Sequence, residues 1–262
     1  MNKRKRAIPN AYIAVVLVLM YVPILLVILY SFNQSRINSV WTGFSLKWYA
    51  ELFADRSMFE ALRNSLILAL SSSVCAAVIG TLGAAGMADK ASRARHTRVM
   101  EYVSTLPIMI PEIILGMVFL VYFSFLRLPF GMLTLIIAHT SFCVPYVYLM
   151  VKARLAGLDK SYIEAARDLG AGGPRAFWDV TLPLIVPSVA SGMLLSFAMS
   201  FDDVIISVFV TGVNVNTLPI KIYTQLKTGV SPKINAMCTL LFAATVLLGL
   251  AAAWIPKKHG RE

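Results

Sequence analysis

Three carboxylates lie inside long apolar stretches of the sequence, where a charged side chain is energetically costly and therefore indicates a function. Glu112 falls within 99–126, and the adjacent Asp202 and Asp203 fall within 184–210. A charged side chain at the centre of a bilayer costs about 2.5–3.5 kcal/mol on insertion scales, and such residues commonly mark a substrate or ion pathway. Acids on two separate segments suit a basic substrate with well-separated positive charges. A proton relay is the other chemistry that they could support.

Each of these acids also has a structural alternative. Glu112 could interact with the dipole of a half-helix that restarts after Pro111, or pair with a basic residue of a partner subunit. If 99–126 is one straight helix, Glu112 lies roughly 21 Å from either end, close to mid-membrane. Adjacent helical residues diverge by roughly 100°. We therefore expect one of Asp202 and Asp203 to face a pathway and the other to bond a neighbouring helix.

Catalysis by the chain itself is not expected. His139 is a lone histidine in an apolar segment, which favours a hydrogen-bonded packing residue. The sequence contains no GxxxxGK[ST] phosphate loop and no HExxH or GxSxG motif. Its three cysteines are scattered, with no metal-ligand spacing. The pattern predicts no catalytic residue, no cofactor and no metal site, and it argues against a membrane-embedded enzyme.

The segments that carry the acids are predicted to cross a membrane. Of the 262 residues, 58% are apolar and 14% charged, and the mean hydropathy is +0.73. Soluble domains have about 45–50% apolar and about 25% charged residues. A spanning helix needs about 20 apolar residues. We predict an all-α, polytopic fold, one transmembrane domain over 1–262, with six spans at approximately 11–32, 65–88, 99–126, 128–151, 184–210 and 234–256.

The basic residues predict the orientation of these spans. Sixteen of the 24 Lys and Arg residues fall in the terminal segments and in the alternate loops on the same side. By the positive-inside rule, both termini then face the cytoplasm. The first apolar run is too long for a signal-peptide core, so we expect an uncleaved first span. The net charge of +11 is thus a topology signal, and nucleic acid is not expected as a partner.

The connection 152–183 is the longest on the predicted cytoplasmic side. We expect a helix over 161–170 with Ser161 as its N-cap and Glu164 completing a capping box. Gly170 and the glycines at 172 and 173 should end it. A short amphipathic helix outside the bilayer either rests on the lipid surface or docks into a groove of a partner protein.

This connection resembles the EAA loop of the permeases of ABC importers. The matching positions are Glu164, Ala165, Ala166, Gly170, Leu182 and Pro183. Val180 stands where that family prefers isoleucine, which is a mild departure. The resemblance implies a type I importer fold, in which the 161–170 helix couples the spans to a cytoplasmic ATPase.

The resemblance extends over nearly the whole chain to polyamine (spermidine/putrescine) importer permeases, in particular to their C-type subunit. The segments that carry it are 31–33 (SFN), 47–49 (KWY), 200–203 (SFDD), 209–212 (FVTG), 217–219 (TLP) and 229–232 (GVSP). For a polyamine, the expected pathway residues are the three carboxylates with aromatic walls that contact the methylene runs. They are Glu112, Asp202, Asp203, Trp48, Tyr122, Ser200 and Phe201.

The resemblance also implies the partners. These are a second, B-type permease, two copies of a cytoplasmic ABC ATPase and an extracytoplasmic polyamine-binding protein, assembled in the bacterial cytoplasmic membrane. ATP hydrolysis would belong to the ATPase. Two alternatives stay open: an ABC permease for another small solute such as ferric iron, phosphonate or thiamine, and an ion-coupled secondary transporter that uses Glu112, Asp202 and His139 as relay groups.

Overall fold

The computed structural model describes the chain except for residues 1–2, 37–39, 89–94, 214, 230 and 255–262, and except for the side chains at 3–11, 95–98, 228 and 252–253. Several basic residues used to predict orientation lie outside the described residues, namely Lys90, Arg93, Lys257, Lys258 and Arg261. The last two residues of the predicted span 234–256 lie outside them as well.

The described chain is almost entirely helical. Its elements are α1 (Lys3–Ser31), α2 (Lys47–Ala54), α3 (Arg56–Ala88), α4 (Arg95–Met109), α5 (Glu112–Phe125), α6 (Met132–Ala156), α7 (Ser161–Asp168), α8 (Gly173–Ala176), the π-helix η1 (Phe177–Thr181), α9 (Leu182–Asp202), α10 (Ile205–Val210), α11 (Leu218–Thr228) and α12 (Pro232–Trp254). An isolated bridge between Asn33 and Phe44 is its one β-type pairing within the described ranges.

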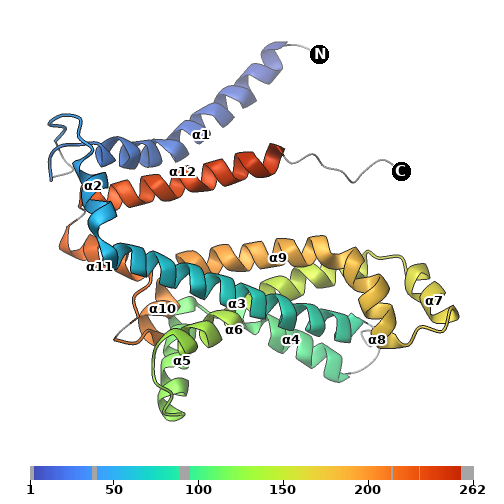
Figure 1. The fold of residues 1–262 in the computed structure, drawn as a ribbon. Coiled ribbons are helices and arrows are strands. Elements are labelled where there is room, and N and C mark those ends of the chain that lie inside the picture. Colours follow the sequence, from blue (N-terminus) through green and yellow to red (C-terminus); the bar gives the residue numbers. More distant parts are fainter. Residues whose placement is uncertain (1–2, 37–39, 89–94, 214, 230, 255–262) are drawn as a thin grey trace. The chain divides into compact units, whose positions relative to one another are not determined.

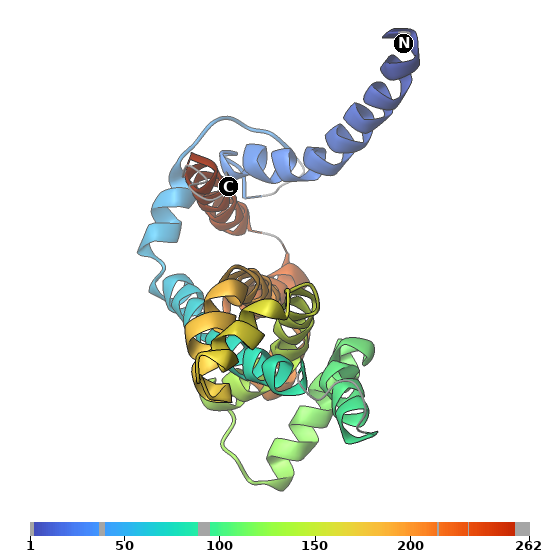
Figure 2. The ribbon, with the colours of Figure 1, turned by 90° about the vertical axis from the view of Figure 1, so that its right-hand side faces the viewer.

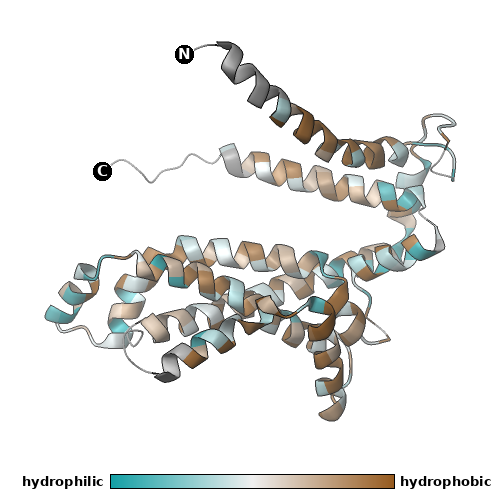
Figure 3. Cartoon of the chain, turned by 180° about the vertical axis from the view of Figure 1, so that it is seen from behind, coloured by the Kyte–Doolittle hydropathy of each residue, from teal (hydrophilic) through white to brown (hydrophobic). Residues whose placement is uncertain are grey.

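Five helical segments in the described chain are long and apolar enough to cross a membrane: Tyr12–Ser31, Arg56–Ala88, Met132–Ala156, Gly173–Asp202 and Pro232–Ala251. A sixth span results if the bent pair of α4 and α5 is counted as one. The predicted all-α, polytopic architecture is therefore confirmed. The hydropathy colouring of the cartoon in Figure 3 shows the coloured parts of α1 and α5 as strongly apolar, whereas α7 carries hydrophilic residues.

Two of the predicted spans are broken helices. The segment 99–126 bends by 108° between α4 and α5, so it is not one straight helix. Pro111 begins the second half with ψ of 133°, and a proline cannot donate the backbone hydrogen bond that a continuous helix would need. Figure 2 shows α4 and α5 running in different directions. The segment 184–210 is likewise interrupted after Asp202, where Asp203 adopts an extended backbone with ψ of 126°.

The chain divides into two compact units. We call Met1–Met58 with Thr224–Glu262 the terminal unit, and Phe59–Tyr223 the central unit. In the terminal unit, α1 and α12 lie side by side (Figure 1). The central unit contains α4 to α10 and most of α3, and therefore all the carboxylates predicted to line a pathway.

Helix α6 forms the core of the central unit. Val147 on α6 is completely buried, and two glycines approach it from neighbouring helices. A Cβ atom on Gly80 of α3 would lie 2.9 Å from Val147 Cβ, and one on Gly192 of α9 would lie 3.0 Å from Val147 Cα. Because small residues let membrane helices approach closely, α3 and α9 both pack directly on α6, as Figure 1 shows.

We predict that Gly80→Ala destabilises the protein. The added methyl would press on Val147 and on the backbone of Tyr148, and such overpacking costs about 1–3 kcal/mol. The measurement is the thermal unfolding midpoint of the detergent-solubilised complex. Gly86→Ala is the matched control on the same helix, because no atom lies within 4 Å of the added Cβ there. Equal midpoints for the two variants would contradict the close approach of α3 and α6.

Candidate functional site

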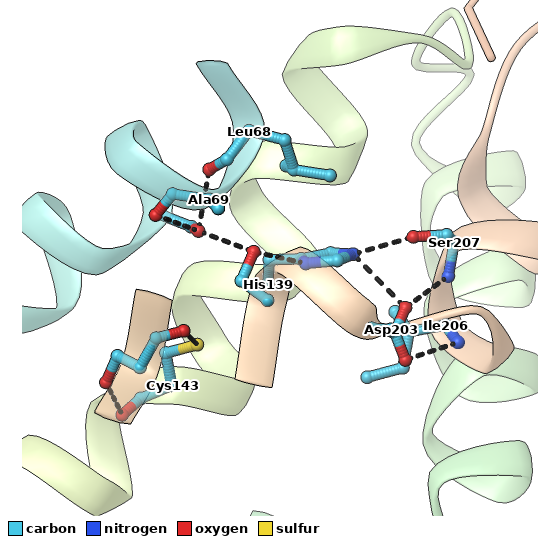
Figure 4. A network of polar contacts seen from close by, with 10 residues as sticks. Leu68, Ala69, His139, Cys143, Asp203, Ile206 and Ser207 are labelled. Atoms are coloured by element: carbon cyan, nitrogen blue, oxygen red, sulfur yellow. Dashed lines mark hydrogen bonds and ion pairs between the residues drawn. The ribbon is translucent and has the colours of Figure 1, made fainter. Parts of the chain in front are cut away.

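A buried network of polar side chains ties four helices of the central unit together. His139 of α6 is fully buried, and its Nδ1 lies 2.8 Å from Ser200 Oγ of α9. Its Nε2 lies 3.1 Å from Ser207 Oγ of α10 and 3.4 Å from Asp203 Oδ2. Ser72 Oγ of α3 donates to Ser200 Oγ at 2.9 Å. In Figure 4 one edge of the imidazole faces Ser207 and Asp203, and the contacts of its other edge lead toward Leu68 and Ala69 of α3. The interpretation of His139 as a hydrogen-bonded packing residue therefore agrees with its contacts.

Asp203 is the most fully bonded of the three acids. It is 7% exposed, and both carboxylate oxygens accept backbone hydrogen bonds from the first turn of α10. Oδ1 accepts from Ile206 N at 3.2 Å, and Oδ2 accepts from Ser207 N at 2.9 Å. This is how a helix-capping acid satisfies the free N–H groups of a helix start. Asp203 thus lies just before α10, bonds the first turn of that helix and contacts α6 through His139.

Asp202 has a different environment from its neighbour. It is the last residue of α9 and is exposed. Among the described residues it has no cationic partner within ion-pair distance. Because the helix ends between the two aspartates, the expectation that they sit about 100° apart on one continuous helix is wrong. Asp203 therefore makes the bonds to neighbouring helices, and Asp202 makes no such bond within the described part of the chain.

Glu112 lies at the other helix break. It is the first residue of α5, directly after Pro111, and it is half-buried. The mid-membrane depth computed for a straight span no longer applies, because the span bends there by 108°. A negative charge in the first helical turn interacts favourably with the helix dipole, so the alternative placement at a restarted half-helix describes its position correctly.

The contact between α5 and α10 brings the two breaks near each other. Gly116, one turn after Glu112, faces the ring of Phe209 on α10, and a Cβ at Gly116 would lie 2.5 Å from that ring. The position of α10 therefore determines where α5 can lie.

The other predicted pathway residues of the central unit differ in exposure and in contacts; they are Tyr122, Phe201 and Ser200. Tyr122 on α5 is 54% exposed, with its ring 5.9 Å from that of Phe123. Phe201 is half-buried and stacks on Phe197 at 5.9 Å. Ser200 is buried in the His139 network and presents no free hydroxyl surface. The two aromatic rings thus remain available as apolar walls, whereas Ser200 holds helices together.

Trp48 belongs to the terminal unit and is buried there. Its indole N–H donates to the backbone oxygen of Asn33 at 2.7 Å, and Tyr49 OH lies 2.8 Å from Ser31 Oγ. The Asn33 side chain accepts from Thr42 N and donates to Val40 O. The two polyamine-permease-like segments 31–33 and 47–49 are therefore bonded to each other. We call this arrangement the aromatic clasp; it joins α2 to the end of α1.

An ion pair secures the same unit at the other end of α2. Lys233 Nζ of α12 lies 2.6 Å from Asp55 Oδ2, and both side chains are largely buried, at 22% and 18% exposure. Asp55 Oδ1 also accepts hydrogen bonds from Ser57 and from Met58 N. The hydrogen bond from Lys233 holds the pKa of Asp55 well below its usual range, with Ser57 adding to the effect.

Helix α7 forms in the predicted place with a different N-terminal cap. The N-cap residue is Lys160, and Ser161 is the first helical residue, so the predicted capping box of Ser161 and Glu164 is wrong. Instead Asp159 Oδ1 accepts a hydrogen bond from Ser161 N at 3.0 Å. That bond lowers the pKa of Asp159 below its usual range.

The C-terminus of α7 explains why a glycine stands at position 170. Gly170 has φ of +85°, a left-handed conformation that side chains rarely adopt. Gly170 N donates to Arg167 O at 2.9 Å, and Ala171 N donates to Ala166 O at 3.0 Å. These two bonds are those of the Schellman motif. The helix therefore ends at Asp168, two residues before the predicted end.

The surface of α7 is mostly open. Glu164 and Ala165 are exposed, whereas Ile163 and Ala166 are half-buried. Leu169 is 90% exposed at the C-cap. Ile163 and Arg167 line a groove of about 360 Å³ whose other walls come from the ends of α3 and α6 and from α8 and η1.

The last two residues of the EAA-like pattern begin the next long helix. Leu182 is the first residue of α9, and its N–H donates to Phe177 O, five residues back, which closes the wide turn of η1. Pro183 is exposed in the first turn of α9. The glycines at 172 and 173, expected only to stop a helix, also begin α8, so α8, η1 and α9 run as one helical segment over Gly173–Asp202.

Sequence reasoning missed Ser72, Ser207 and Asn33. The serines carry no signal beyond the serine-rich run 71–73, because a small polar residue suits any close helix contact. No group of three or more His, Cys, Asp or Glu side chains in the described part of the chain could hold a metal ion.

The fold and these sites define a multi-pass helical membrane protein with a structured connection outside its spans. The chain matches the family described as "Binding-protein-dependent transport system inner membrane component" over residues 76–258, and it belongs to that family. It is therefore a transport permease of the inner membrane.

Curated relatives match the chain over most of its length. It is 38% identical over 249 residues to the putrescine transport system permease protein PotI of Escherichia coli strain K12, covering 93% of this chain and 88% of that protein. It is 36% identical over 252 residues to the spermidine/putrescine transport system permease protein PotC of the same strain, with coverages of 96% and 95%. The resemblance to polyamine permeases is thus confirmed as a sequence relationship.

Solved structures of ABC transporters share the fold. A chain of a bacterial ABC transporter involved in the import of the acidic polysaccharide alginate aligns with a TM-score of 0.75 at 16% identity, covering 97% of this chain and 99% of that one. A chain of the MetNI methionine ABC transporter aligns with a TM-score of 0.58 at 18% identity, covering 76% and 95%. The predicted type I importer fold is confirmed.

We predict a pH-dependent loss of stability in Lys233→Met. Because the pKa of Asp55 is lowered in the folded state, the pair stabilises the protein above the ordinary aspartate pKa near ~3.9 and loses this effect as the pH falls through the lowered value. The thermal midpoint of Lys233→Met should lie a few degrees below wild type at pH 7, with the difference shrinking below about pH 4. Lys47→Met, which removes an exposed pair with Glu51, should change little. A difference independent of pH would contradict the pairing.

Proposed function

We propose that the chain is the membrane-spanning permease subunit of an ATP-driven ABC importer and forms half of a translocation pathway for polyamines such as spermidine and putrescine. One observation carries the proposal. Two carboxylates, Asp202 and Glu112, stand at the two helix breaks of the central unit without a cationic partner among the described residues, and the contact between α5 and α10 brings these two breaks near each other.

Two carboxylates at neighbouring helix breaks favour the binding of a polycation. In a low-dielectric medium the two negative charges repel each other, and each has a free-energy cost of burial until a positive charge pairs with it. A polyamine supplies several ammonium groups separated by methylene runs, so it can meet both acids at once. The exposed ring of Tyr122 and the half-buried ring of Phe201 offer apolar and cation–π surface for the stem. The names of the two relatives, putrescine and spermidine/putrescine permeases, agree with this substrate class.

Trp48 contributes to this proposal as a structural residue. Its indole N–H is satisfied by Asn33 O inside the aromatic clasp, which leaves no free group for a substrate. Asp203 and Ser200 likewise support the site through the His139 network.

The assembly that this function requires has four further subunits. The family depends on a binding protein, and a six-span permease needs a second, B-type permease to close the pathway. Two copies of an ABC ATPase would supply energy, since the sequence has no phosphate-binding loop of its own. In this assembly the termini and α7 face the cytoplasm, and the lipid bilayer covers the apolar surface of helices such as α1.

The exposed surface of α7 suits it for coupling to the ATPase. Glu164, Ala165 and Gly170 are all open to a partner, while Ile163 anchors the helix to the rest of the central unit. Leu182 and Pro183 then connect the region to α9, the helix that ends at Asp202.

We predict that Asp202→Asn lowers ATP-dependent polyamine uptake about tenfold or more while the complex still assembles. The substitution removes the charge that meets the substrate and alters no hydrogen bond that holds a helix. The measurement is uptake of labelled spermidine by proteoliposomes that contain the whole transporter. Glu60→Gln, which neutralises an exposed acid on α3, is the matched control and should transport normally.

Asp203→Asn should behave differently, because it disturbs the start of α10 and should lower the yield of folded complex. Wild-type uptake by Asp202→Asn would overturn the role of that carboxylate. Uptake driven by an ion gradient without ATP would favour the secondary transporter, and ATP-driven uptake of another solute in place of polyamines would favour a permease for that solute.

We predict that Gly170→Val weakens ATPase binding several-fold. A β-branched residue strongly disfavours the left-handed conformation at φ of +85°, so the end of α7 should unwind. Gly172→Val is the matched control, because Gly172 has φ of −66° and ψ of 163°, which valine adopts readily. The readout is the amount of ATPase recovered with affinity-tagged permease. Glu164→Lys should also lower recovery, by reversing an exposed charge. Equal recovery for both glycine variants would count against coupling through α7.

A further inference from the structure

We infer that His139 is a positioning residue for transport: it holds Asp203 against α6, so that the span breaks after Asp202 and presents that carboxylate near Glu112. The inference rests on the proposed function, in which Asp202 meets the substrate. It assigns a specific task to the buried histidine at the centre of the polar network.

The helix break needs a cause beyond local sequence. Between Gly192 and Gly212 there is neither a proline nor a glycine, and most residues there are apolar. Sharp interruptions of a helix otherwise come from prolines, glycines, π-bulges or an inserted side chain. Here the backbone departs from the helix at Asp203, whose carboxylate accepts the N–H groups of Ile206 and Ser207. The polar contacts of Asp203 are therefore the physical reason for the break.

His139 is placed to keep Asp203 in that arrangement. Its Nε2 faces Asp203 Oδ2 at 3.4 Å and Ser207 Oγ at 3.1 Å, so one ring edge contacts both the capping acid and the helix that it caps. The other edge is held by Ser200, which is bonded to Ser72 of α3. With the proton on Nε2, the ring donates toward Asp203 and Ser207 while Nδ1 accepts from Ser200 Oγ. Figure 4 shows this line of contacts on both sides of the ring.

Helix α10 is attached to α6 a second time. Thr134 Oγ1, near the start of α6, donates to Val210 O at the end of α10 at 3.0 Å. The short helix is thus fixed at both ends, by His139 and by Thr134. Its Phe209 contacts Gly116 of α5, the helix that begins at Glu112. The attachment to α6 therefore sets the relative position of the two carboxylates.

The first experiment compares substitutions of His139 by spermidine uptake in proteoliposomes containing the whole transporter. The amide of glutamine reaches the place of Nε2, whereas that of asparagine reaches only the place of Nδ1. His139→Ala and His139→Asn should therefore lower uptake about tenfold, and His139→Gln should retain most of it. Uptake equal to wild type in His139→Ala, or equal rescue by Asn and Gln, would overturn the inference.

The second experiment measures the accessibility of position 202 directly. A variant that only destabilises the fold would not change the accessibility of this position selectively. Asp202→Cys is introduced with Cys75→Ser and Cys238→Ser, leaving the buried Cys143. The rate of modification by a cationic methanethiosulfonate reagent reports the exposure of position 202. Adding His139→Ala or Ser72→Ala should slow it several-fold. Ser73→Ala should leave it unchanged, because Ser73 Oγ donates to Leu70 O of its own helix.

The two experiments separate this inference from the proposed function. An unchanged modification rate in the presence of His139→Ala means that His139 does not position residue 202, whatever the substrate. Normal spermidine uptake by Asp202→Asn, with the modification rate still dependent on His139, would instead overturn the substrate role of Asp202 and leave the positioning role of His139 supported.

Discussion

The burial of the Asp203 carboxylate is the constraint on which the central unit depends. A carboxylate that is withdrawn from water must have its oxygens bonded, and in a bundle of apolar helices few groups can do this. Two backbone N–H groups of α10 and the imidazole of His139 meet this need, and Ser200 and Ser72 hold the imidazole. Satisfying one charge therefore fixes contacts among α3, α6, α9 and α10.

Two adjacent residues of the same type acquire different tasks through these bonds. Asp203 is buried and bonded, and Asp202 is exposed without a cationic partner among the described residues. The two residues have the same type and adjacent positions in the sequence. They differ because α9 ends between them, at Asp202. Glu112 shows the same arrangement at the second break, where Pro111 interrupts the helix and the acid begins the new one. Acids at broken helices in membrane transporters are well placed to contact a substrate, because backbone and side chains there line a cavity.

The features that sequence reasoning predicted correctly are those with local physical causes. Apolar runs of sufficient length predicted the spans. Pro111 indicated one helix break, and Gly170 indicated the C-terminal end of α7. The break at Asp203 has no local signal, because its cause is the contact with His139, 64 positions earlier in the sequence. The burial of Trp48 has no local signal for a similar reason, because its indole N–H bonds the backbone oxygen of Asn33, 15 positions earlier in the sequence.

One continuous helical segment connects the two regions of the central unit that we propose to be functional, α7 and Asp202. From Gly173 to Asp202, α8, η1 and α9 form 30 residues of helix, about 45 Å at 1.5 Å per residue. Its first turns line the groove beside α7, and its last residue is Asp202. Since Gly192 packs this segment against Val147 of α6, a displacement of α7 cannot be absorbed by sliding α9 sideways. The wide turn of η1, just before Pro183, is the place where the segment departs from regular α-helix, so bending there would carry motion at the α7 end toward Asp202.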